Sequence, residues 1–222
     1  MIISHGRRYI FVHIPKTGGT SLALALESRA KADDILIGDT PKARQRRGRL
    51  QALRPAGRLW KHSTLADIDG IIGRAELETY FIVTLVRNPW DRVVSYYHWL
   101  RAQRFDHPAV GLAQSVGFAD FVRAEQTIAS LRANSYGSYV RAADGVEHCT
   151  AFVRLEHLAD DIAGFERHLG FGLRQERSNA SDRQADYRGY YDDTTANIVA
   201  QACAVDIARF GYAFDPPQLH RN

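Results

Sequence analysis

The chain has 222 residues, the size of one ordinary domain, and 45% apolar and 24% charged residues, a composition typical of soluble globular proteins. The net charge of +4 is too small to indicate nucleic-acid binding by itself. Cys149 and Cys203 are too few for a disulfide framework or a metal site and indicate a reducing compartment. No signal peptide or membrane span is recognisable, so we expect a cytoplasmic protein.

A strand–loop–helix junction opens the chain, with a buried strand expected at residues 8–14 and a helix at 20–30. The glycines between them let the backbone turn sharply, and the start of a helix presents unpaired N–H groups to an anion such as phosphate. The residues expected to bind it are Lys16, Thr17, Gly18, Gly19, Thr20 and Ser21. Thr20 or Ser21 is expected to cap the helix. Because the lysine precedes the glycines, the standard P-loop motif is absent, and a plain Gly-Gly turn with a solvated lysine stays open.

Strands and helices alternate along the rest of the chain. The expected elements are a short strand at 33–38, a basic loop or frayed helix at 41–58, a short strand and then a helix within 59–73, a central strand at 80–86, helices at 87–103 and 117–125, a strand at 150–156, a helix at 158–170 and a last long helix at 194–210. This alternation predicts a three-layer, P-loop-like α/β fold with a mainly parallel sheet, in a single domain over residues 1–222.

A second junction of the same kind follows the central strand. Arg87 stands at the strand end, Asn88 is a good N-cap, Pro89 suits the first helical position and Asp91 falls in the first turn. Arg87 and Ser95 could together bind a second phosphate, because ligands bind at the carboxyl ends of parallel strands. A salt bridge for Arg87 and simple helix packing for Ser95 stay open.

The two junctions, "IPKTGGTSL" and "RNPWDRVVSYY", resemble those of the sulfotransferases that use 3′-phosphoadenosine-5′-phosphosulfate (PAPS). "FVRLEHL" at 152–158 and the segment 179–214 resemble a bacterial branch similar to the carbohydrate sulfotransferases, among them the heparan sulfate 2-O-sulfotransferases. The resemblance implies that the first loop holds the 5′-phosphosulfate, with the amides of Gly18 to Ser21 on the phosphate and Lys16 on the oxygen that bridges phosphate and sulfate. It also implies that Arg87 and Ser95 hold the 3′-phosphate.

The implied reaction is an in-line transfer of the sulfuryl group from PAPS to an acceptor hydroxyl, which leaves 3′,5′-ADP and requires no metal. The hydroxyl needs a general base, and we expect His62, which lies at the end of a short predicted strand between the two donor motifs. The resemblance to the 2-O-sulfotransferases also implies a catalytic histidine in this region. His98 or a carboxylate is next in order, whereas His13 is expected in the core.

The C-terminal segment at about 178–192 is expected, by resemblance, to cover the nucleotide. Arg183 could reach the 3′-phosphate, and Tyr187 or Tyr190 could pack on a ring of the donor. A solvated loop before the last helix is the alternative.

The acceptor is expected to be a carbohydrate or another small molecule, with no nucleic-acid partner, and the oligomeric state is not predicted. The arginine-rich loop at about 41–58 could dock an acidic acceptor, or it could simply be solvated. Two other functions stay open: a P-loop kinase that uses ATP, and a nucleotide- or nucleic-acid-binding protein without catalysis.

Overall fold

The computed structural model describes residues 1–173 and 183–215. The chain divides into two compact units, the first made of Met1–Val86 and Tyr136–Asn179 and the second of Arg87–Ser135 and Ala180–Asn222. None of the helices in the described ranges has the length and apolar character that a membrane crossing needs. The expectation of one domain over the whole chain stays a prediction.

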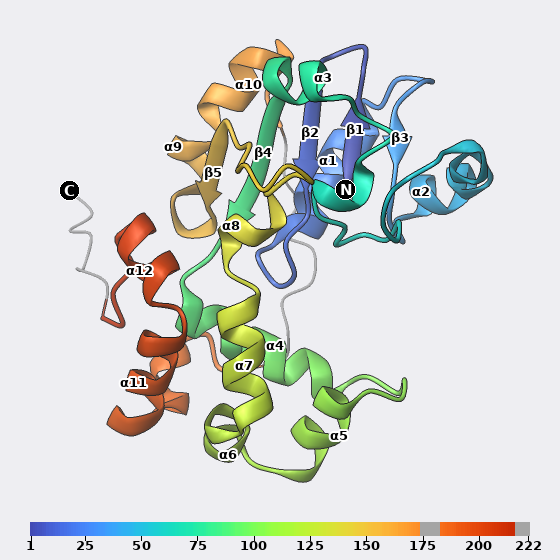
Figure 1. Ribbon diagram of the computed structural model, residues 1–222. Coiled ribbons are helices and arrows are strands. Elements are labelled where there is room, and N and C mark those ends of the chain that lie inside the picture. Colours follow the sequence, from blue (N-terminus) through green and yellow to red (C-terminus); the bar gives the residue numbers. More distant parts are fainter. Residues whose placement is uncertain (174–182, 216–222) are drawn as a thin grey trace. The chain divides into compact units, whose positions relative to one another are not determined.

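The first unit is built on a five-stranded sheet in the order β3-β1-β2-β4-β5, which can be followed from right to left in Figure 1. The strands are β1 (Ile2–Ser4), β2 (Tyr9–Val12), β3 (Ile35–Leu36), β4 (Phe81–Val86) and β5 (Ala151–Arg154). β2, β4 and β5 are parallel neighbours, and β1 runs antiparallel to both β2 and β3. All strands except β1 therefore share one direction, and the predicted α/β fold with a mainly parallel sheet is confirmed.

Helices and short helical turns connect these strands. They are α1 (Gly19–Ser28), α2 (Pro41–Arg46), η1 (Arg47–Ala52), η2 (Ala66–Ile68), α3 (Arg74–Thr79), α8 (Tyr136–Tyr139), η3 (Leu155–His157), α9 (Leu158–Asp161) and α10 (Ala163–Leu169). On one face of the sheet, Phe11 and Leu85 pack with Leu22 and Leu26 of α1 and with Phe165 of α10. Residues on the other face, such as Ile10 and Ile82, are also almost fully buried, as expected for parallel strands.

The second unit is helical in its described part. Its helices are α4 (Pro89–Arg101), α5 (Pro108–Ser115), α6 (Phe118–Arg123), α7 (Glu125–Ala133), η4 (Tyr187–Tyr190), α11 (Asp193–Ala202) and α12 (Ala204–Phe210). Helix α4 begins as the sequence predicts, with Pro89 in the first turn and the Asn88 side chain accepting a hydrogen bond from the Trp90 N–H at 3.1 Å. Trp90 also donates its indole N–H to the Ala196 carbonyl of α11 at 2.9 Å.

Several predicted elements are wrong. The helix expected within 59–73 is only the short turn η2, and the helix expected at 158–170 is divided at Ile162 into α9 and α10. Residues 59–61 form a turn in place of a strand, because the buried Ser63 hydroxyl accepts from the Trp60 N–H and donates to the Arg58 and Trp60 carbonyls. The last helix breaks at Cys203, whose φ of −110° and ψ of 20° separate α11 from α12 while its side chain packs into the apolar core. The segment expected as a basic loop or frayed helix at 41–58 contains the short helices α2 and η1. The sequence does not predict β1, because a strand of this length has too short a pattern to be recognised.

Gly19, the first residue of α1, is predicted to tolerate no side chain. A Cβ there would lie 2.3 Å from Cδ2 of His13, a buried ring that stacks on Phe11. Gly19→Ala should lower the free energy of unfolding by roughly 1–3 kcal/mol, the usual cost of overpacking. Urea unfolding should show no such loss for Gly48→Ala, the matched control, since a Cβ at Gly48 meets nothing within 4 Å. Equal effects of the two substitutions would contradict this packing.

Candidate active site

The loop between β2 and α1 is held by a hydrogen bond within the loop, and no side chain caps the start of the helix. The Thr17 hydroxyl donates to the Ile14 carbonyl at 2.9 Å, and Lys16 takes a left-handed φ of 66°. The N-cap is Gly18, at φ 84°, so the expected cap by Thr20 or Ser21 is wrong: these two lie inside the first turn. The first turn contains no acidic residue. Its amide N–H groups and the positive end of the helix dipole therefore suit an anion.

The conformation of the loop explains its two glycines. Gly18 has a φ that other residues rarely adopt, and a Cβ there would lie 2.8 Å from Cδ1 of Leu155. Gly19 has no room for a side chain beside His13. Both glycines are thus fixed by packing and backbone geometry, and the approach of the loop to Leu155 of η3 and to the His13 ring depends on them.

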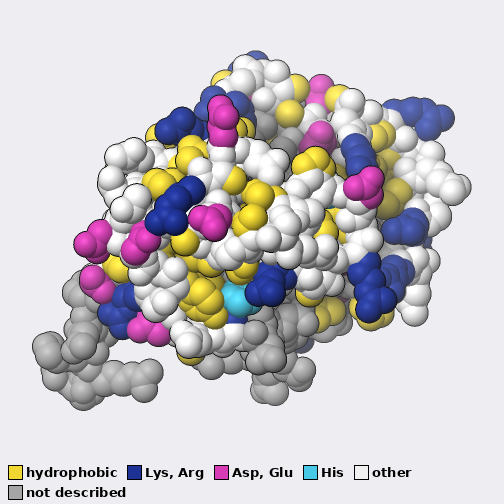
Figure 2. Space-filling model, turned by 90° about the horizontal axis from the view of Figure 1, so that it is seen from below, with side chains coloured by type: hydrophobic (Ala, Val, Ile, Leu, Met, Phe, Trp, Pro, Cys, Tyr) yellow, Lys and Arg dark blue, Asp and Glu magenta, His cyan; other side chains and the backbone are white. Residues whose placement is uncertain are grey.

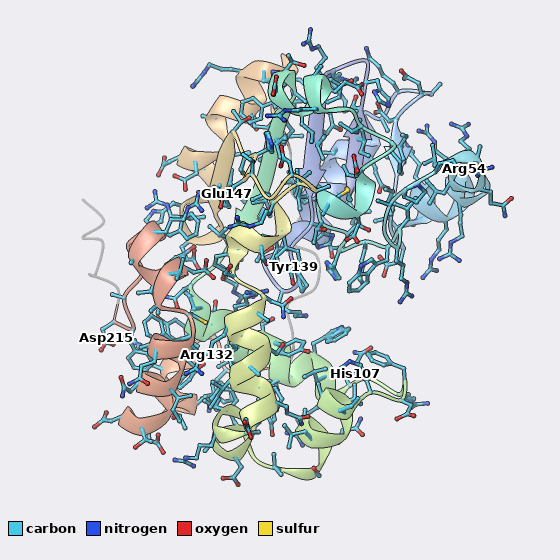
Figure 3. All side chains as sticks on the ribbon, in the orientation of Figure 1. Arg54, His107, Arg132, Tyr139, Glu147 and Asp215 are labelled. Carbon is cyan, nitrogen blue, oxygen red and sulfur yellow. The ribbon has the colours of Figure 1, made fainter. Side chains whose placement is uncertain are left out.

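His62 is hydrogen-bonded to the residue that begins this loop. Its Nδ1 lies 2.7 Å from the carbonyl oxygen of His13, and the two imidazole rings meet edge to face with centroids 4.8 Å apart. A carbonyl oxygen can only accept, so Nδ1 carries the proton and Nε2 keeps its lone pair. Three residues further on, the Leu65 N–H donates to the Tyr139 carbonyl of α8 at 3.0 Å, which anchors this segment (Tyr139 is labelled in Figure 3).

Both histidines are held neutral. Burial lowers the pKa of His62 to about 4; the hydrogen bond to His13 opposes this shift, and the charge of Lys61 adds to it. Burial, together with nearby positive charges that include Lys16, holds the pKa of His13 well below its usual range. The end of β2 therefore carries two adjoining neutral imidazoles, and the positive charge of Lys16 acts on His13. Lys61, the residue before His62, is ion-paired with Asp39, with 2.7 Å between its Nζ atom and the Asp39 Oδ2 atom.

In the second unit, one carboxylate bridges two arginines. Asp91 Oδ2 lies 2.6 Å from an Nη atom of Arg87, and Asp91 Oδ1 lies 2.6 Å from Nη2 of Arg183. All three side chains are less than a fifth exposed. The salt bridge left open for Arg87 is thus present, but it is shared with a second guanidinium. The shared carboxylate holds Arg87 and Arg183 close together, and the three side chains carry a net positive charge.

Ser95 and Tyr187 have clear places in the same unit. Ser95 is buried on α4, one turn beyond Asp91. The Tyr187 hydroxyl donates to the Phe214 carbonyl at 2.5 Å and lies 3.2 Å from Nδ2 of Asn88, so it supports the start of α4. Burial raises the pKa of Tyr187 to about 12. Of the expected nucleotide-covering segment 178–192, residues up to 182 lie outside the described residues.

The predicted site residues thus form two groups, one in each unit. Lys16, Thr17, Gly18, Gly19, Thr20, Ser21 and His62 belong to the first, and Arg87, Ser95, Arg183 and Tyr187 to the second. Asp91 was noted in the sequence only as a first-turn acid, although its spacing of four from Arg87 could have indicated the ion pair. Among residues 1–173 and 183–215, no group of three or more His, Cys, Asp or Glu side chains could hold a metal ion.

Residues 1–212 match the family described as "Sulfotransferase family". The chain belongs to the sulfotransferase family. The predictions of this family and of an enzyme are therefore confirmed. A search of curated proteins found no match. Among solved structures, the sulfotransferase is similar to mouse sulfotransferase SULT7A1 complexed with PAP, at 16% identity and a TM-score of 0.50 over 90% of this chain and 83% of that chain. This likeness shows a shared fold.

The shared carboxylate generates a prediction for the second unit. Asp91→Asn would leave Arg87 and Arg183 side by side without the charge that holds them, and the free energy of unfolding should fall by roughly 1.5–3 kcal/mol. Asp120→Asn is the matched control, because Asp120 is 71% exposed and lies 3.6 Å from its partner Arg123. It should cost less than about 1 kcal/mol. Chemical unfolding of both variants measures the difference, and equal losses would contradict the bridge.

Proposed function

We propose that this sulfotransferase moves the sulfuryl group of PAPS to a hydroxyl of a carbohydrate acceptor, with His62 as general base and 3′,5′-ADP as the second product. The observation that carries the proposal is the hydrogen bond from His62 Nδ1 to the His13 carbonyl at the start of the loop. It sets an unprotonated Nε2 beside a loop suited to an anion. The PAP in the mouse enzyme of similar fold supports PAPS as the donor.

The loop of the first unit binds the 5′-phosphosulfate. The amides of Gly18 to Ser21 donate to the phosphate oxygens, although the Ser21 N–H also lies 3.3 Å from the Gly18 carbonyl, whereas the Thr17 hydroxyl is bonded to the Ile14 carbonyl. Lys16 meets the negative charge that grows on the bridging oxygen as the bond from sulfur to that oxygen breaks. Thr20 and Ser21, in the first turn of α1, add hydroxyl donors.

The second group of residues binds the 3′-phosphate. Arg87 and Arg183 are held together by Asp91, and Ser95 lies one turn further along α4. Two guanidinium groups held in place provide the paired donors that a phosphate prefers. Tyr187 supports this site by fixing Asn88, the N-cap of α4. The 3′-phosphate is the group that distinguishes PAPS from ATP, so these residues select the donor.

His62 takes the proton of the acceptor. The hydroxyl proton moves to Nε2 while the acceptor oxygen bonds to sulfur and the sulfur separates from the bridging oxygen. A pKa of about 4 leaves nearly all of the imidazole unprotonated at neutral pH. The charges of the bound donor then raise the basicity of the ring, because an anion nearby favours the imidazolium.

The first test addresses the 3′-phosphate. Arg87→Ala should weaken binding of 3′,5′-ADP by about 2–3 kcal/mol, the loss of a charge-assisted contact, and leave binding of 5′-AMP nearly unchanged. Arg92→Ala, on the same helix, is the matched control and should change neither. Calorimetry with both nucleotides decides the matter. Equal losses for the two nucleotides would assign Arg87 a purely structural role.

The second test addresses the base. His62→Ala should bind 3′,5′-ADP like the parent and lose transfer of labelled sulfuryl from PAPS to a carbohydrate by roughly a hundred- to ten-thousandfold. His107→Asn, which keeps an N-cap acceptor on α5, should retain activity.

The pH profile sharpens this second test. Since the pKa of the free enzyme's His62 is about 4, kcat/KM for PAPS, which reports the enzyme before the donor binds, should stay flat as the pH falls through the ordinary histidine range and decline only near 4. A decline centred near pH 6.5, the ordinary histidine value, would contradict the assignment of His62, as would full activity of His62→Ala.

A further inference from the structure

Trp60 is an exposed indole on a rigid turn. Trp60 is 44% exposed, whereas Trp90 is 4% exposed and lies in the core of the second unit. The backbone that carries Trp60 is fixed by the Ser63 hydroxyl, which accepts from the Trp60 N–H at 2.9 Å. A single exposed indole is ordinary by itself, so its significance depends on its neighbours.

The neighbours of Trp60 place it beside the proposed base. The indole meets the His62 ring edge to face, with centroids 5.0 Å apart. The guanidinium of Arg58 lies 5.9 Å from the centroid of the indole ring. An aromatic ring, a cation and the imidazole thus adjoin one another on a stretch of five residues.

The surface that continues from this stretch is basic. The exposed arginines of the helices α2 and η1 and of the chain that follows them are Arg44, Arg47, Arg49, Arg54 and Arg58. Figure 2 shows Lys and Arg side chains at the right-hand end of the view, the end at which Figure 1 places α2, and Figure 3 labels Arg54 there. Arg58 belongs to this basic stretch and lies four positions before His62.

We propose that Trp60 and Arg58 are the residues that position the acceptor, and that the acceptor is an acidic sugar. The apolar C–H face of a sugar ring packs on the indole, and a carboxylate or sulfate of the same or the next sugar binds the Arg58 guanidinium in a bidentate manner. Because the indole touches the imidazole, a sugar stacked on Trp60 presents its hydroxyl to His62 Nε2. This inference rests on the proposed function and names its acceptor site.

The test measures acceptor binding and turnover separately. The probes are an oligosaccharide that contains uronic acids, a neutral oligosaccharide of the same length and a tyrosine peptide. By calorimetry without donor, the parent should bind the acidic oligosaccharide best, and Trp60→Ala should weaken this binding by roughly tenfold or more, as loss of a central aromatic contact does. Trp60→Tyr should recover most of it. Arg58→Gln should remove the preference for the acidic over the neutral oligosaccharide.

Turnover should follow the same pattern. In transfer assays, Trp60→Ala and Arg58→Gln should raise KM for the acidic acceptor while leaving the affinity for 3′,5′-ADP unchanged. A merely structural role of Trp60 would lower donor affinity or stability, and Tyr would not restore the acceptor affinity. Trp99→Phe, on α4, is the matched aromatic control and should behave as the parent.

The outcomes separate this inference from the proposed function. Transfer to the acidic acceptor with an unchanged KM in Trp60→Ala overturns the acceptor site and leaves the proposed function standing. Acidic oligosaccharide bound through Trp60 without any transfer from PAPS supports the acceptor site and overturns the proposed function. A parent that binds no acidic oligosaccharide, or that prefers the tyrosine peptide, overturns the acceptor site.

Discussion

The hydrogen bond between His62 Nδ1 and the His13 carbonyl joins two parts of the chain that are far apart in sequence. His13 follows the central strand β2 and begins the loop that leads to α1, and His62 lies on the segment that follows the basic helices α2 and η1. One contact thus sets the tautomer of the imidazole and fixes the ring against His13, whose own ring adjoins Gly19 at the start of α1. The positions of the β2–α1 loop and of His62 therefore depend on each other.

This arrangement costs stability in acid. The pKa of His62 is about 4 in the folded protein and about 6.5 in an unfolded chain, so the unfolded state binds more protons between these values. The free energy of unfolding therefore falls as the pH drops from about 6.5 to about 4, and His62 contributes no pH dependence above that range. His13, whose pKa burial holds well below its usual range, acts in the same direction. The burial that keeps His62 neutral therefore lowers the free energy of unfolding in acid.

Local patterns in the sequence predict the two strand–helix junctions well. The apolar run before Lys16 and the Asn88-Pro89 start of α4 are decided by residues within a few positions, and both appear in the structure. The sequence predicts a strand at Trp60, where the structure has a turn. The turn is held by hydrogen bonds of the Ser63 hydroxyl to the Trp60 N–H and the Arg58 carbonyl, and a local apolar pattern does not reveal these bonds.

Contacts between distant residues could not be predicted in this way. The sequence indicates His62 by its position between two motifs and by resemblance, but its bond to a residue 49 positions earlier exists only in the fold. The bridge from Asp91 to Arg183 spans 92 positions, and no local pattern encodes it. The pKa of His62 also departs from the ordinary histidine value because burial, which the sequence does not give, is its largest cause.

The tautomer and protonation of His62 are the central claim, and nitrogen-15 NMR of the imidazole in the free protein measures both. The resonance of His62 is assigned by its loss in His62→Ala. We expect a protonated Nδ1 and an unprotonated Nε2 at neutral pH, with a titration near 4. A proton on Nε2 at neutral pH, or a titration near the ordinary value of about 6.5, would contradict the placement of this side chain as the base.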